Sequence, residues 1–238
     1  MGEFTFVIEK PCPICGQMTR IVKTKSRLLA ERTDEDYCVH YKGFNPYFYR
    51  VWFCEHCGFA ADEKRFLKTI PTKAKRKIQD FLANRHLGME FTEVRGVPEA
   101  VASYKLAIFY EELTDGMFNT RAGLYLSMAW VYRDTDEREK EMEALQKAAE
   151  LYKASLTSER YPIGNMTDNM CMYLIGAIYF RMGDAERSAQ YLSRIIGDQK
   201  ARDTELQVYN RARDLWQDVK EMREKSGATN SETPQKKG

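Results

Sequence analysis

Apolar and polar residues alternate with a helical period over most of the chain after residue 96. Each of the stretches concerned carries an apolar stripe at spacings of three and four residues, as amphipathic helices do. The helices predicted in this way span residues 97–113, 120–134, 136–156, 166–182, 184–197 and 202–225. An earlier helix is predicted to begin after Pro71 and to end at Gly88, with Ala74, Ile78, Phe81 and Leu82 on its apolar stripe.

The first 60 residues lack this helical period and contain short runs of β-branched and aromatic residues. Residues 19–24 (TRIVKT) and 47–53 (YFYRVWF) are typical of strands. Pro46 fixes its own φ and favours an extended Asn45, which would lead the chain into the second strand. The pattern therefore predicts an α+β protein that is mostly α, with a small β module at its N-terminus.

The predicted helices share a recurring small-x-x-Tyr signature, formed by Ala107 and Tyr110, Ala129 and Tyr132, and Gly176 and Tyr179. Residues 170–197 resemble a tetratricopeptide repeat, with Gly183 and Asp184 at the turn and Ser188 as the small packing residue. The period from Tyr132 to Tyr179 is 47 residues rather than 34, which a longer second helix and the loop at 158–165 would explain. We expect an antiparallel helical array of tetratricopeptide type, closed by the last helix.

Four of the six cysteines form two identically spaced pairs, in CPICG at 12–16 and CEHCG at 54–58. Two thiolates at this spacing can hold one cation while the chain turns, and the glycine that follows accepts a positive φ. Two such knuckles supply four sulfurs, which suits a closed tetrahedral zinc site of the zinc-ribbon kind. We expect one structural Zn²⁺, bound by Cys12, Cys15, Cys54 and Cys57.

Other interpretations of these pairs are a disulfide framework and a redox dithiol. Disulfides belong mainly to exported proteins, and the sequence carries no export signal. A redox CxxC usually opens a helix within a βαβ unit, whereas these pairs adjoin predicted strands. A zinc site that releases its ion when the thiols are oxidised is a further possibility.

The remaining cysteines and histidines leave several interpretations open. Cys38 and His40 could replace or supplement a knuckle ligand, although a buried or half-exposed thiol beside an ordinary histidine explains them better. His56 is expected to face solvent or to form a local hydrogen bond, and Cys171 to lie in the core. Asp34 and Asp36 suit loop solvation or capping better than acid/base catalysis, because no nucleophile accompanies them.

The segment from Cys12 to Ala60 also resembles a known family. CPICG, DED at 34–36 and FNPYFYRVWFCEHCGFA at 44–60 are similar to the bacterial family named domain of unknown function 2225. The resemblance covers residues 5–220 and implies a zinc-ribbon-like segment followed by helical repeats. It also implies that the four paired cysteines are the metal ligands, and it implies no activity.

Composition and charge narrow the class of protein. With 43% hydrophobic and 12% aromatic residues the chain can form a proper core, and it has no apolar run long enough to cross a membrane. We therefore expect a cytoplasmic protein. Charge is uneven, because Lys and Arg exceed Asp and Glu by eight to three over residues 62–86, whereas Asp and Glu exceed Lys and Arg by fourteen to nine over 87–160. The basic residues Lys73, Lys75, Arg76 and Lys77 could contact nucleic-acid phosphates, or could simply form a solvated face near the acidic region.

These patterns predict four parts of the chain: a zinc-ribbon-like module at 1–62, a basic linking helix at 63–96, helical repeats at 97–225 and a disordered tail at 226–238. No phosphate loop, nucleophile elbow or HExxH motif is present, so we expect no enzymatic activity. We expect a scaffold or adaptor whose helical groove binds a protein partner, with nucleic-acid binding as the alternative. The residues expected to line the groove are Trp130, Arg133, Tyr173 and Arg181.

Overall fold

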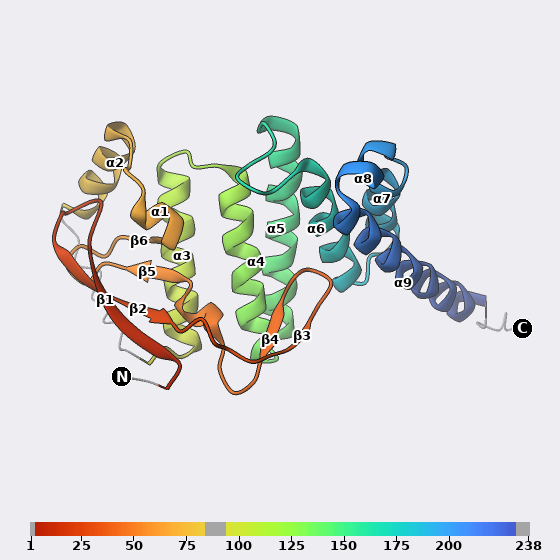
Figure 1. Cartoon of the computed structure of the whole chain (residues 1–238), viewed down its shortest axis with the longest axis horizontal. Coiled ribbons are helices and arrows are strands. Elements are labelled where there is room, and N and C mark those ends of the chain that lie inside the picture. Colours follow the sequence, from red (N-terminus) through yellow and green to blue (C-terminus); the bar gives the residue numbers. More distant parts are fainter. Residues whose placement is uncertain (1–2, 84–93, 232–238) are drawn as a thin grey trace, which may run out of the picture. The chain divides into compact units, whose positions relative to one another are not determined.

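The computed structural model describes residues 3–83 and 94–231, with the backbone alone for 226–231, and the chain is α+β and mostly helical (Figure 1). The strands are β1 (Thr5–Pro11), β2 (Met18–Thr24), β3 (Ala30–Thr33), β4 (Val39–Tyr41), β5 (Val51–Phe53) and β6 (Ala60–Asp62). The helices are η1 (Pro46–Tyr49), α1 (Glu63–Leu67), α2 (Thr72–Leu82), α3 (Val97–Leu113), α4 (Phe118–Asp134), α5 (Arg138–Ser158), α6 (Asp168–Arg181), α7 (Ala185–Ile196), α8 (Gln199–Thr204) and α9 (Leu206–Ser231). Across the described residues, no helix combines the length and the apolarity that a membrane crossing requires.

The strands form three antiparallel hairpins, in which β1 pairs with β2, β3 with β4 and β5 with β6. In the first hairpin Thr5 lies opposite Thr24 and Pro11 opposite Met18. The strand predicted at 19–24 is therefore confirmed as β2. Its partner β1 precedes the first cysteine pair, and the β3–β4 hairpin lies between the two pairs; neither was predicted as individual strands.

The strand predicted at 47–53 is only partly correct. Residues Pro46–Tyr49 form the 3-10 helix η1, and the strand β5 begins at Val51. Asn45 is extended, as expected, but its side-chain oxygen accepts a hydrogen bond from the Tyr47 amide at 2.9 Å and so caps a helical turn. A proline at the first helical position favours the same turn, which overrides the strand preference of the aromatic residues.

The β5–β6 hairpin and η1 pack against α3 through buried aromatic residues (Figure 1). The Phe59 and Tyr110 rings lie 5.3 Å apart, and the Tyr110 hydroxyl donates to the Gly58 carbonyl at 3.1 Å. The Tyr104 hydroxyl, on the same helix, donates to the Tyr47 carbonyl at 2.8 Å. Helix α3 therefore shares one core with the N-terminal hairpins.

The division of the chain into compact units differs from the predicted boundary at residue 62. One unit comprises Met1–Asp34 and Cys38–Leu151, and the other comprises Glu35–Tyr37 and Tyr152–Gly238. The N-terminal module thus belongs to the same unit as α3 and α4, because aromatic residues on α3 complete its core. The predicted linking segment 63–96 contains α1 and α2, and the expected extension of α2 to Gly88 lies outside the described residues.

In the second unit, α6 and α7 form a closely packed helical hairpin. The Ser188 hydroxyl donates to the Gly176 carbonyl at 2.8 Å. A Cβ atom added at Gly176 would lie 3.0 Å from two side-chain carbons of Leu192, so a larger residue would force Leu192 to move by a few tenths of an ångström. The surrounding core includes the buried residues Tyr173, Ala177, Ala189, Leu192, Ile195, Ala212, Leu215 and Val219.

The last predicted helix, 202–225, is divided in the structure. Helix α8 begins after Asp198, whose carboxylate accepts from the Lys200 amide at 2.9 Å, and it ends at Thr204, with Glu205 as the residue that caps it. The Glu205 carboxylate turns toward the start of α6, where it accepts from the Asn169 side chain at 2.9 Å and contacts the Thr167 hydroxyl. Helix α9 then continues to Ser231, into the predicted tail, while residues 232–238 lie outside the described part.

Candidate metal centre

Each cysteine pair occupies the turn of one hairpin, and the two turns have the same backbone geometry. In the first turn, the Cys12 amide donates to the Gln17 carbonyl and the Gly16 amide to the Cys12 carbonyl, both at 2.9 Å. In the second, the Cys54 amide donates to the Phe59 carbonyl and the Gly58 amide to the Cys54 carbonyl, both at 2.8 Å. The glycines adopt φ values of +79° and +80°, which explains why glycine follows each pair.

The two turns bring the sulfurs of Cys12, Cys15, Cys54 and Cys57 together, a group called here the four-cysteine cluster. All four Sγ atoms lie within 4.8 Å of one another. The Cys12–Cys57 and Cys15–Cys54 sulfur pairs are separated by 3.7 and 3.8 Å. A regular tetrahedron with Zn–S bonds of about 2.3 Å has edges of about 3.8 Å, so the cluster has the size of a zinc tetrathiolate site.

Hydrogen bonds between the thiols shift the pKa values of Cys12, Cys54 and Cys57. Hydrogen bonding with Cys54, together with burial, raises the pKa of Cys12 to about 12. Hydrogen bonds with Cys12 and Cys54 raise the pKa of Cys57, whereas hydrogen bonds from Cys12 and Cys57 lower the pKa of Cys54. A cation that binds all four sulfurs has to displace the shared protons, so metal binding is coupled to proton release.

Polar contacts hold the second knuckle against the first hairpin. The Glu55 amide donates to the Thr19 hydroxyl at 3.2 Å, and the Arg20 amide donates to the Glu55 carboxylate at 3.2 Å. The His56 ring lies 2.8 Å from the Met18 carbonyl, to which its Nε2 donates, so this histidine supports the fold of the cluster and is not a ligand. These contacts could not be predicted from the sequence, because the partners lie 35 or more residues apart.

Cys38, His40 and Cys171 lie outside the four-cysteine cluster. Cys38 and His40 group instead with Asp34, in an arrangement considered below. Cys171 is fully buried in α6, as predicted, and its thiol donates to the Tyr152 carbonyl at 3.8 Å. Burial raises the pKa of Cys171 to about 12. Asp36 is 2% exposed, which excludes loop solvation, one of the two roles predicted for it, and leaves capping as the other.

Three of the four residues predicted to line a partner groove are buried. The Trp130 ring packs against Tyr47 at 4.8 Å, and the Arg133 side chain is 3% exposed between two carboxylates. Tyr173 is 2% exposed and donates its hydroxyl to the Glu35 carbonyl at 2.9 Å. Arg181 is partly exposed. A partner would have to disrupt this packing to reach the buried three, so the binding surface proposed below does not use them.

The four basic residues predicted as a phosphate-binding group lie on α2. Lys73 and Arg76 are exposed, and Lys75 and Lys77 are partly exposed. Lys77 pairs with Asp115 at 2.7 Å, as expected if the basic helix contacts the acidic region that follows it. The Gln79 side chain on the same helix donates to the Ile14 carbonyl at 3.1 Å, which places α2 beside the first knuckle.

Comparisons with known proteins give one match. The model of a family described as uncharacterized protein conserved in bacteria (DUF2225) matches residues 8–219. Neither the curated proteins nor the solved structures gave a significant match.

Proposed function

The chain belongs to the bacterial DUF2225 family, and we propose that it is a non-catalytic, zinc-containing scaffold that binds a protein partner through its helical repeats. The observation that carries this proposal is the size of the four-cysteine cluster, whose sulfur separations of 3.7 and 3.8 Å suit one tetrahedral zinc ion. Four protein sulfurs fill every position of such a site, so the bound ion would have no place for water or substrate. Its role would be to stabilise the fold.

The helical hairpin α6–α7 supports the assignment of tetratricopeptide-like repeats. Its close approach at Gly176, the positive φ of Gly183 in the turn and the buried Ser188 correspond to the positions expected of such a repeat. Stacked helical hairpins of this kind form extended surfaces that bind peptides or helices of other proteins. The repeat therefore provides a reason to seek a protein partner.

A row of stacked arginine and tyrosine side chains on α6 and α7 is the surface we assign to the partner. The Arg187 guanidinium lies 4.7 Å from the Tyr179 ring centre, and Arg194 lies 5.5 Å from that of Tyr191. The two tyrosine rings are themselves 6.1 Å apart. The Arg187 Nε already contacts the Asp184 carboxylate at 2.6 Å, so the donors offered to a partner are its remaining N–H groups and those of Arg194, and this surface suits an acidic protein segment.

Charge reversal on this surface is expected to abolish partner binding. We expect the double variant Arg187→Glu, Arg194→Glu to lose at least tenfold in partner recovery, because both cationic contacts become repulsive. The measurement is affinity capture from native lysate after nuclease treatment, compared by quantitative mass spectrometry. Arg213→Glu, an exposed arginine on α9, is the matched control and should retain the partner. Equal recovery of the partner with the wild-type protein, the double variant and the control would exclude this surface.

Nucleic-acid binding is the alternative function, favoured by the position of α2 beside the first knuckle. If Lys73, Lys75, Arg76 and Lys77 contact phosphates, log Kobs should fall with log salt at a slope of about −3 to −4 for double-stranded DNA. Changing all four to glutamine should then abolish binding in a shift assay. Binding that is absent, or that does not respond to salt, excludes this alternative and leaves the protein partner.

A further inference from the structure

A second group of metal-ligating side chains lies at the base of the β3–β4 hairpin loop. Asp34 follows β3, Cys38 precedes β4 and His40 lies within β4. The Asp34 amide donates to the Cys38 carbonyl at 2.8 Å, which closes the loop and brings the side chains to one place. One oxygen, one sulfur and one nitrogen of these residues lie within 4.8 Å of one another. Asp34, Cys38 and His40 are called here the loop-base group.

The buried and partly buried side chains around the loop-base group carry more negative than positive charge. The Asp34 carboxylate contacts His40 at 2.7 Å and the Arg133 guanidinium at 2.8 Å. Arg133 also contacts Glu141 at 2.6 Å, and both of these side chains are 3% exposed. One partly buried and one buried carboxylate therefore face one guanidinium. Arg32 also approaches Asp34, at 3.4 Å, and the two His40 ring nitrogens, at 3.3 and 3.2 Å. Its side chain is 68% exposed, so water screens its charge and the guanidinium would have to move away from His40 when a metal ion binds.

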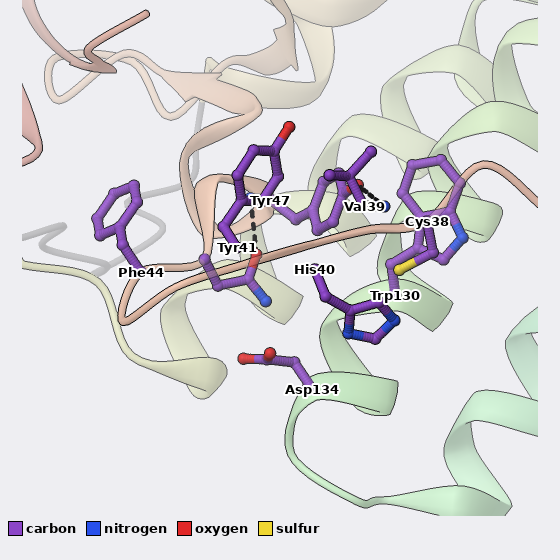
Figure 2. A pocket seen from close by; sticks show the side chains of 9 residues that line it. Cys38, Val39, His40, Tyr41, Phe44, Tyr47, Trp130 and Asp134 are labelled. Carbon is purple, nitrogen blue, oxygen red and sulfur yellow. Dashed lines mark hydrogen bonds between the residues drawn. The ribbon is translucent and has the colours of Figure 1, made fainter. Parts of the chain in front are cut away.

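A small hollow opens beside the loop-base group (Figure 2). Cys38 and His40 line it together with Asn45, Tyr47, Trp130 and Asp134, among other residues, and it has room for about one water molecule. Figure 2 shows the Cys38 sulfur and the His40 ring on the same side of the hollow, next to Trp130. Two of the three possible ligands thus border a space that could hold one further ligand.

From this geometry we infer that Asp34, Cys38 and His40 form a second site for a transition-metal ion of the zinc class, with a water molecule or small anion in the hollow as its fourth ligand. Oxygen, nitrogen and thiolate sulfur are all zinc ligands, and three protein ligands with one open position differ from the closed four-cysteine cluster. Deprotonation of Cys38 would add one negative charge to those of Asp34 and Glu141. Together with the positive charge of Arg133, this leaves a net negative charge that a divalent cation can balance.

Metal binding requires only a small change in the separation of Asp34 and His40. Two ligands about 2.0 Å from a tetrahedral zinc ion are separated by about 3.3 Å. The His40 nitrogen and the Asp34 oxygen are 2.7 Å apart, so they would separate by about 0.6 Å when the ion replaces the proton between them. Arg133 is a positioning residue in this site, because it holds the Asp34 carboxylate from the side that faces Glu141.

The test is the number of zinc ions that the full chain binds. We expect the wild-type protein, saturated with zinc and passed through a desalting column, to retain about two ions per chain by mass spectrometric metal analysis. Cys38→Ser and His40→Gln should each retain about one. The control Cys171→Ala, which alters a cysteine outside both groups, should retain two.

Substitution with Co²⁺ gives a second measurement that requires no variant. A tetrathiolate site and a site with one thiolate differ in the intensity of their sulfur-to-cobalt charge-transfer bands. Only the loop-base site has an open position, so added azide should shift the visible spectrum of one bound cobalt and leave the other unchanged. One ion per saturated wild-type chain, two ions in Cys38→Ser, or a spectrum that azide does not alter would each overturn the second site.

Discussion

Replacing Cys54 with serine is expected to remove one zinc ion per chain and to unfold the first unit, which comprises Met1–Asp34 and Cys38–Leu151. Cys54 is fully buried in the second knuckle, and serine is a poor zinc ligand. Structural zinc contributes about 10 kcal/mol or more to the folding of small metal-dependent modules, which is as large as the stability of many whole domains. We therefore expect a loss of at least about 5 kcal/mol in the free energy of unfolding.

The loss should extend beyond the hairpins into α3. Phe59 and Gly58, which directly follow the second cysteine pair, contact Tyr110 on that helix. An unfolded knuckle would expose this aromatic contact, so α3 should lose its protection together with β5 and β6. Hydrogen exchange followed by mass spectrometry would resolve the response by segment. The second unit, which has its own core around Leu192 and Leu215, is expected to keep its protection.

Cys171→Ala is the matched control for this experiment. It removes a buried cysteine from the second unit, outside the four-cysteine cluster. We expect it to cost only about 1 kcal/mol for the lost thiol and to leave the metal content unchanged. A Cys54→Ser protein that remains folded without zinc would contradict a structural role for the metal. Exchange confined to residues 3–62 would instead restore the predicted boundary of an independent module.

The four-cysteine cluster could be predicted from the sequence because its geometry is set locally. A CxxCG segment contains both the thiols and the glycine whose positive φ closes the turn, so each half of the cluster is encoded within five residues. The packing of Tyr110 on Gly58 and Phe59 depends on residues about 50 positions apart. A single sequence gives no signal for such a pair, and the boundary drawn at residue 62 therefore separated elements that share a core.

Local capping and distant polar contacts explain the remaining differences. The strand predicted at 47–53 failed in its first half because the Asn45 side chain caps a 3-10 turn, a local interaction that the aromatic pattern conceals. The break before α9 arises from Glu205, whose carboxylate contacts Thr167 and Asn169 near the start of α6. Helix period alone does not reveal that contact, since it depends on residues 36 and 38 positions earlier.

Arg133 was predicted to lie on a partner surface because of its residue type. Its substitution is the second change for which we expect a large effect. An arginine on a predicted helix is usually solvated, but here its partners Asp34 and Glu141 hold it inside the first unit. Arg133→Met would retain most of the packing volume and leave two partly or fully buried carboxylates without this cation. We expect a loss of about 3–5 kcal/mol in the free energy of unfolding, because uncompensated buried charge is costly. Urea denaturation would measure it.

Arg32→Met provides the matched control, because Arg32 contacts the same Asp34 carboxylate at 3.4 Å with a side chain that is 68% exposed. Screened surface pairs contribute little, so this variant should lose less than about 1 kcal/mol. The comparison also separates the two roles considered for Arg133. If it bound a partner from the surface, Arg133→Met would reduce partner recovery and leave the unfolding transition in place. If Arg133 neutralises buried carboxylates, the urea unfolding transition itself should shift. The difference in the free energy of unfolding between Arg133→Met and Arg32→Met would then measure how strongly burial increases the cost of an unpaired charge.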